Sequence, residues 1–367
     1  MRVAVACCAL TGTLGLLAVT AGAQADRESA AAATLPARYL VTTYNTRVNV
    51  TKPGAKVDAV ELVDGHGRVL RLIDEGCCWF ADARFSPNGR MIAWMDKRGL
   101  NVANANGMHH RLLVDASTHC TLECVGLSYA WAPDSATIAV GGAGAQTNEL
   151  LTVNVKTGTK TRMGRVARFT EYVVIGYSPD GSRLAVDVES GDAGTSSCCK
   201  SLLVVERPDG TRQRVLFSFF DAIHDGPADA TWSPDGTHMA FTDDGMDRRD
   251  PRFGIVDVAA ATVRPVAGMN VVDASPVWSP DSSELTAVTY RPHPLTYSVS
   301  TVALASGRPT KIGPGDQPIA WYRDGTILTV GGENGNVLYA LSAAGGPERR
   351  IFALPRPQQI LTIEPAP

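Results

Sequence analysis

The sequence predicts an all-β fold, a seven-bladed β-propeller with four antiparallel strands per blade. A short phrase recurs six times: an aromatic residue, then most often Ser, Pro, Asp and Gly. Its aromatic residue returns after 46, 46, 55, 46 and 43 residues. A period in this range means that one supersecondary unit is copied along the chain. Between the phrases lie short apolar runs separated by Gly and Pro, with almost no helical periodicity. The aromatic residues are Phe85, Trp131, Tyr177, Trp232, Trp278 and Trp321.

The first 25 residues are expected to be a signal peptide. Arg2 supplies a positive charge, residues 9–20 are apolar, and residues 21–23 or 23–25 offer a small-x-small cleavage site. The apolar run is too short to span a bilayer comfortably, and no other stretch approaches that length. We therefore expect a secreted protein without a membrane span in the mature chain. A flexible segment over 26–37 would precede a single propeller domain over 38–364.

The two ends of the chain are expected to share one blade. Three strands, at 38–43, 57–63 and 68–73, precede the first phrase and lack an inner strand, whereas one strand at 359–364 is left over after the last unit. Pairing this C-terminal strand with the N-terminal blade closes the ring and removes exposed sheet edges. Seven blades require about 47 residues each, which matches the phrase spacing, while the alternative of six blades requires about 54.

The phrase itself reads as the turn between the first and second strands of a blade. Pro presets φ, Asp bonds the local backbone and Gly adopts a positive φ. The repeated aspartates are therefore interpreted as turn residues, and no catalytic residue is predicted among them. The tryptophans are expected to pack between neighbouring blades, with an indole N–H that can reach a backbone acceptor. They are Trp131, Trp232, Trp278 and Trp321.

Residues 232–241, Trp-Ser-Pro-Asp-Gly-Thr-His-Met-Ala-Phe, follow the pattern xxxWSPDGxxIAF. The chain thereby resembles the WD40-like PD40 repeats of the TolB-type propeller family over about residues 38–364. The resemblance implies a periplasmic or secreted interaction scaffold, and similar propellers are N-terminal domains of prolyl-peptidase-like enzymes. No G-x-S-x-G motif is present, so the hydrolase domain of those enzymes is not expected. Three phrases depart from the pattern, which brings the geometry of their corners into question. Tyr322-Arg323 replaces Ser-Pro in the last phrase, and Ser135 and Ser282 replace the turn Gly in two others.

Six cysteines remain after the signal peptide, and an even number in an exported protein favours disulfides. They fall in connections that leave three adjacent blades on one face. Bridges between connections are expected, with a local Cys120–Cys124 loop as the competing arrangement. Zinc or copper bound with His119, His224 or His293 is the alternative. Neither CxxC nor HxxxH spacing is present, so no metal and no cofactor is predicted. The disulfide candidates are Cys77, Cys78, Cys120, Cys124, Cys198 and Cys199.

The face with the cysteines is also the candidate binding face. Its long connections carry aromatic and charged residues, and insertions on one face of a repeat protein often mark the surface that binds. Such a mixture suits protein or peptide recognition. Long connections without a function are the alternative. The candidate ligand-binding residues are Trp79, Phe219, Phe220, Asp221, His224, Asp225, Tyr290, Arg291 and His293.

The composition of the chain narrows the classes of function that are possible. The chain has 34 basic and 37 acidic residues and no basic tract, which excludes a nucleic-acid partner. We expect a non-enzymatic scaffold that binds a protein, peptide or wall-associated ligand through the cysteine face. The rival hypothesis is a lyase or glycan-processing enzyme with its site at the axial mouth, where acidic, His and Tyr side chains from several blades would meet. A third is a module that binds a domain on a separate chain. The sequence specifies no oligomeric state.

Overall fold

The computed structural model describes most strands of the chain and many of their turns. The described residues are 35–45, 47, 56, 58–76, 81–115, 127–142, 149–163, 170–190, 200–220, 229–242, 253–266, 275–292, 295–314, 317–332, 335–355 and 357–367. The predicted signal peptide and most of the predicted flexible segment lie outside this part of the chain.

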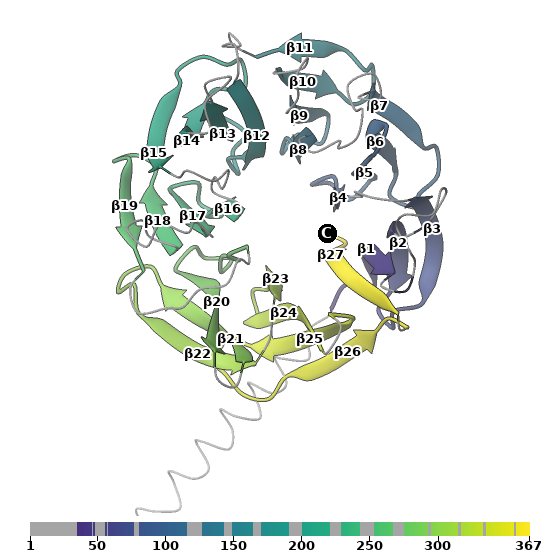
Figure 1. Ribbon diagram of the computed structural model, residues 1–367, viewed down its shortest axis with the longest axis vertical. Coiled ribbons are helices and arrows are strands. Elements are labelled where there is room, and N and C mark those ends of the chain that lie inside the picture. Colours follow the sequence, from purple (N-terminus) through teal and green to yellow (C-terminus); the bar gives the residue numbers. More distant parts are fainter. Residues whose placement is uncertain are drawn as a thin grey trace, which may run out of the picture.

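Seven antiparallel sheets stand around a central axis, as Figure 1 shows. None of the described residues is helical, and within the described ranges no helix has the length and apolar character needed to cross a bilayer. The prediction of an all-β, seven-bladed propeller is thus confirmed, and the six-bladed alternative is wrong.

We call the blade that joins the two chain ends the closing blade and number the others 1 to 6 along the chain. The closing blade consists of β27 (Gln358–Pro365), β1 (Arg38–Asn45), β2 (Asp58–Asp64) and β3 (Val69–Gly76). Blade 1 contains β4 (Ala81–Phe85), β5 (Met91–Asp96), β6 (Gly99–Asn104) and β7 (Arg111–Asp115). Blade 2 contains β8 (Leu127–Trp131), β9 (Thr137–Gly142), β10 (Leu150–Asn154) and β11 (Lys160–Arg162). Blade 3 contains β12 (Thr170–Tyr177), β13 (Leu184–Ser190), β14 (Lys200–Glu206) and β15 (Arg214–Phe220).

The remaining blades follow in the same order. Blade 4 contains β16 (Asp229–Trp232), β17 (His238–Thr242), β18 (Phe253–Asp257) and β19 (Thr262–Pro265). Blade 5 contains β20 (Glu284–Pro292), β21 (Leu295–Ala303) and β22 (Pro309–Pro314). Its inner position is held by residues 275–278, through a single bridge from Trp278 to Leu285. Blade 6 contains β23 (Gln317–Trp321), β24 (Thr326–Gly331), β25 (Val337–Ser342) and β26 (Arg349–Ala353).

The closing blade confirms the predicted pairing of the chain ends. β27 lies beside β1, yellow against purple in Figure 1, and Thr362 pairs with Thr42. The N–H of Ala366 donates to the carbonyl of Arg38 at 3.0 Å. The equivalent bond in the first phrase runs from the N–H of Ser86 to the carbonyl of Met91 at 2.8 Å. The last three residues therefore take the place of the start of a phrase in this blade.

The core lies between the blades, because both faces of each middle strand are covered by neighbouring sheets. In β5, Ile92 packs with Leu40 of the closing blade, and the next residue, Ala93, packs with Ile138 of blade 2. Burial on both faces explains why these strands read as continuous apolar runs instead of alternating ones.

Candidate functional site

The strand order gives the ring two unlike ends. In blades 1 to 6 the first-to-second and third-to-fourth turns leave at one end, which we call the phrase end, and the third-to-fourth turn of the closing blade leaves at the same end. The second-to-third connections and the links between blades leave at the other, which we call the loop end. The longest connections, from β1 to β2, from β7 to β8 and from β17 to β18, all belong to the loop end.

Four of the six phrase turns are closed by their own serine and acidic or amide side chain. In blade 3, Ser178 Oγ donates to Asp180 Oδ1 at 2.5 Å and accepts the N–H of Arg183 at 3.0 Å. Asp180 Oδ1 also accepts the N–H of Ser182 at 3.0 Å. The same set of bonds recurs in three other phrases, with Ser86 and Asn88, with Ser233 and Asp235, and with Ser279 and Asp281. The prediction that these aspartates are turn residues is confirmed.

The turn bonds also fix the charge of the aspartates. Hydrogen bonds from Ser178 and Ser182 lower the pKa of Asp180 to about 2. Those from Ser279 and Ser283 lower the pKa of Asp281 to about 2. A carboxyl with such a pKa remains ionised near neutral pH, so it is not poised to donate a proton in general acid catalysis. These two acids therefore hold turns together and are poorly suited to acid–base chemistry.

The phrase turns also contact one another around the ring. The N–H of Asn88 donates to Ser135 Oγ in the next blade at 3.0 Å, and the N–H of Asp235 donates to Ser282 Oγ at 3.0 Å. Ser135 and Ser282 have φ values of 58° and 63°, close to the 70° of Gly181 in blade 3. The two Gly-to-Ser departures therefore keep the corner geometry and add a bond between blades.

The last phrase departs further from the pattern. Its turn is one residue shorter, and the N–H of Tyr322 bonds the carbonyl of Thr326 at 2.8 Å. The Tyr322 hydroxyl, in place of the serine hydroxyl, is buried without a hydrogen-bond partner in the structure, and burial raises its pKa. The hydroxyl of Tyr39, fully buried in the closing blade, is also unpartnered, and burial raises its pKa to about 12.

Two phrase tryptophans tie neighbouring blades together as predicted. Trp232 Nε1 donates to the carbonyl of Gly176 at 3.0 Å, and Trp278 Nε1 donates to that of Thr231 at 3.3 Å. In each case the acceptor lies on the inner strand of the preceding blade. Trp131 packs in the core between blades 1 and 2 as predicted, but its buried Nε1 has no hydrogen-bond partner in the structure.

The predicted binding residues are described only in part. Phe219 and Phe220 end the outer strand β15 of blade 3, and Tyr290 and Arg291 lie near the end of β20 in blade 5. Both strand ends belong to the loop end, and blade 4 separates them. Their side chains are not described. The other candidates lie outside the described residues, namely Trp79, Asp221, His224, Asp225, His293, Cys77, Cys78, Cys120, Cys124, Cys198 and Cys199.

Sequence reasoning missed the four buried acids of the described chain, of which two are Glu61 on β2 and Glu206 on β14. Their exposed fractions are 7% and 4%, and burial raises the pKa of both. Glu206 Oε2 accepts a bond from Gln213 Nε2 at 2.7 Å, whereas Glu206 Oε1 and Glu61 Oε2 have no hydrogen-bond partner in the structure. Across the described part of the chain, no three His, Cys, Asp or Glu side chains gather to hold a metal ion.

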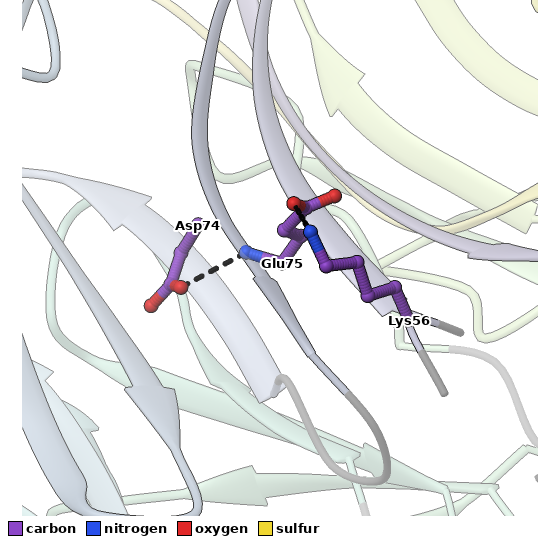
Figure 2. A network of polar contacts seen from close by, with 3 residues as sticks. All are labelled: Lys56, Asp74 and Glu75. Atoms are coloured by element: carbon purple, nitrogen blue, oxygen red, sulfur yellow. Dashed lines mark hydrogen bonds and ion pairs between the residues drawn. The ribbon is translucent and has the colours of Figure 1, made fainter. Parts of the chain in front are cut away.

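A polar network at the rim links the closing blade to blade 1. Figure 2 shows Lys56 paired with Glu75, whose N–H donates to Asp74 Oδ1 at 2.9 Å. The other oxygen of Asp74 accepts Trp94 Nε1 of blade 1 at 2.9 Å. Asp74 therefore links the closing blade to blade 1 through a side-chain hydrogen bond.

Comparison with known proteins gives the fold. No family model matches the chain, and no curated protein matches it. An oligogalacturonate lyase solved with manganese is similar at 15% identity and a TM-score of 0.55, over 83% of this chain and 90% of that one. A prolyl endopeptidase is similar at 15% identity and a TM-score of 0.56, over 91% of this chain and 53% of that one. At such identity these likenesses show the propeller fold alone.

TolB proteins are also among the similar structures. TolB from Acinetobacter baumannii has 16% identity and a TM-score of 0.49, over 77% of this chain. The chain spans 64% of the length of that TolB and about half of the endopeptidase.

Proposed function

We propose that this chain is a secreted, non-enzymatic binding propeller whose loop end contacts a protein, peptide or wall-associated ligand. The observation that carries the proposal is the difference between the two ends. At the phrase end the repeated side chains are engaged in turn bonds, whereas the long connections belong to the loop end. Binding residues are disproportionately found on loops held by a rigid scaffold.

The position of the candidate residues favours an extended ligand. Phe219 and Phe220 end a strand of blade 3, and Tyr290 and Arg291 end a strand of blade 5. A ligand in contact with both pairs has to cross blade 4. Aromatic residues and arginine are enriched where proteins bind one another, so a polypeptide suits this span better than a small molecule.

The positions of the cysteines also support the loop end as the binding surface. The strand order assigns the connections from β3 to β4, from β7 to β8 and from β13 to β14 to the loop end, and these connections contain the six cysteines of the expected mature chain. Disulfides there would fix the long connections, as is usual for an exported protein. Mass mapping of the exported protein tests this step. We expect bridged cysteines, and six free thiols would contradict both export and the role of the bridges.

The binding experiment uses the full exported chain, immobilised through a tag after Pro367, which lies beside the Gly89 turn at the phrase end. Secreted and envelope proteins are passed over it, and captured proteins are identified and then tested as purified partners. The variant Phe219→Ala/Phe220→Ala is expected to lose binding. The exposed phrase-end variant Lys156→Ala is the matched control and is expected to retain it. Binding that survives the double substitution, or that is lost with Lys156→Ala, contradicts the proposal.

The second candidate is an enzyme, a lyase or glycan-processing propeller with its site at the axial mouth. It is favoured by the shared fold with the oligogalacturonate lyase over most of both chains. The residues available to it are Asp221, His224, Asp225, Tyr290 and His293. Turnover of a uronate oligosaccharide, lost in His224→Ala while the fold is retained, would support this candidate over the scaffold.

A further inference from the structure

The outer strand of the closing blade, β3, is unusually apolar where it faces solvent. Val69, Leu70 and Leu72 are 48%, 52% and 47% exposed, among the most exposed large apolar residues of the described chain. We call these three residues the β3 patch. Figure 1 places β3 at the outer rim, and among the described strands none lies beside it as a fifth strand of the blade. An exposed apolar edge strand is a site where another chain can pair or pack.

Other outer strands protect the same edge with charge. Exposed positions on β11, β22 and β26 are held by Lys160, Arg162, Lys311, Arg349 and Arg350. Charged side chains on an edge strand disfavour association with a second sheet. The β3 patch therefore departs from a safeguard that other blades of the ring retain.

The neighbouring blade extends the apolar rim. The turn of blade 1 that contains Gly107 packs on β3, because a Cβ on that glycine would lie 2.7 Å from Arg71 Cδ and 3.0 Å from Ile73 Cγ1. Met108, the next residue of the turn, is 46% exposed. Exposed apolar surface that is shared by two elements and edged by charges is typical of a protein interface.

The charges on β3 and its preceding turn indicate which partner fits. Arg68 and Arg71 lie at the start of the segment, and Asp74 and Glu75 lie near its end. Lys56 pairs with Glu75, so the end of the segment has one net negative charge from these three side chains. When two such strands run antiparallel, the basic half of each faces the acidic half of the other, and opposite charges across strands are stabilising. A segment with this polarity is complementary to itself about a two-fold axis, the symmetry most common in protein dimers.

We propose that a second copy of this chain occupies the β3 patch, with the two β3 strands antiparallel. The pairing of β3 with β2 is shifted twice, between Val60 and Glu61 and between Leu62 and Val63, so β3 is bulged. Bulges limit how long a regular backbone ladder can be. The contact therefore rests mainly on the apolar side chains and the end charges, and the dimer is expected to be reversible.

Sedimentation velocity of the full mature chain over a range of concentrations tests the proposal. The wild-type chain is expected to shift from monomer to dimer as concentration rises, and Leu70→Lys is expected to remain monomeric. Val215→Lys is the matched control, since Val215 is 49% exposed on the outer strand of another blade. It should dimerise as the wild type does. A wild type that is monomeric throughout, or equal loss of the dimer in both variants, overturns the proposal.

A charge exchange identifies the partner as a second copy. Arg68→Glu and Glu75→Arg each place like charges together in a self-pair, so each variant alone is expected to dimerise more weakly than the wild type. An equimolar mixture restores opposite charges at both ends and is expected to recover the wild-type dimer fraction. Failure of the mixture to recover it contradicts the antiparallel arrangement. A monomer whose β3 amides are protected from hydrogen exchange means that another part of the chain covers the patch, and also overturns the proposal.

Discussion

At the scale of single residues, the repeated phrase is maintained by a small set of hydrogen bonds. Ser178 Oγ and Asp180 Oδ1 satisfy backbone N–H groups that would otherwise be unpaired in the turn. Asn88 occupies the same place in the first phrase and makes the same bonds without a charge. The structural role of this position is therefore hydrogen bonding, and the charge adds a dependence on pH.

Stability is expected to fall in acid as these turns are protonated. The pKa values of Asp180 and Asp281 are lowered from 3.8 to about 2 in the folded chain. Their contribution is present above the unfolded value and is lost as the pH falls through the folded value. Because both carboxyls are exposed, about 1 kcal/mol each is expected after solvent screening. The variant Asp180→Asn/Asp281→Asn should flatten the profile of melting temperature between pH 4 and 2.

The control for this profile is Asp134→Asn. Ala132 stands in place of the serine in that phrase, so the serine bond is missing, and the one hydroxyl bond to Asp134 is the long one from Thr137 Oγ1 at 3.2 Å. The profile is therefore expected to change less. A double Asn variant with the wild-type slope would contradict the assignment of the acid transition to these turns.

Ser135 offers a second test at this scale, because it combines a positive φ with a bond to Asn88. Ser135→Ala keeps the unfavourable φ and loses the bond, so it is expected to lower the free energy of unfolding by about 1 kcal/mol. Ser135→Gly loses the bond but relieves backbone strain of about 1 kcal/mol, and it should be close to neutral. Urea denaturation of the three proteins measures the difference. An alanine variant as stable as the wild type would show that the bond between blades contributes nothing.

At the scale of elements, the propeller is stabilised where inner strands meet across blade boundaries. Trp232 and Trp278 each donate an indole N–H to the preceding inner strand, while Trp131 does not. The three side chains occupy the same position of the repeat but differ in this bond. They therefore separate the effect of the hydrogen bond from that of the aromatic volume.

Substitution by phenylalanine at two tryptophans measures this difference. Trp232→Phe loses aromatic volume and a bond to Gly176, whereas Trp131→Phe loses similar volume and an N–H that has no acceptor. Trp232→Phe is expected to cost about 1 kcal/mol more in the free energy of unfolding, since that is the typical net value of one hydrogen bond. Chemical denaturation gives both values. An equal cost, or a larger one for Trp131→Phe, would contradict the proposed link between blades.

Most strand positions were predictable from the sequence, and the features that were not have a physical reason. Three strands were expected at 38–43, 57–63 and 68–73, and they lie at Arg38–Asn45, Asp58–Asp64 and Val69–Gly76. The phrase marks its own turn, so strand boundaries near it are clear. Buried Glu61 was missed because alternation along a strand normally indicates one solvated face. In a propeller both faces of a middle strand are covered, so a single acid there gives no signal.

The candidate binding residues could be assigned to an end of the ring but not to a shared site. Strand counting predicts where a connection leaves a blade, and by the observed strand order β15 and β20 both end at the loop end. It does not predict how side chains from separate connections meet, because that depends on contacts distant in sequence.

At the scale of the whole molecule, the two ends of the ring exist only because the ring is closed. β27 supplies the inner strand of the closing blade, and Ile360 and Ile363 are buried in the core that this blade shares with blade 6. Without that strand, β1 would have a free edge, and the order that separates the phrase end from the loop end would be interrupted. Both the binding proposal and the position of β3 at the outer rim depend on this closure.

Hydrogen exchange of the C-terminal strand tests the closure most directly. In the full chain the amides of β27 that pair with β1 are expected to exchange as slowly as those of Leu40–Thr43, and through the same global opening. Fast exchange over Gln358–Pro365 while β1 and β2 remain protected would mean that the strand is not fastened there, and would contradict the closed seven-bladed ring.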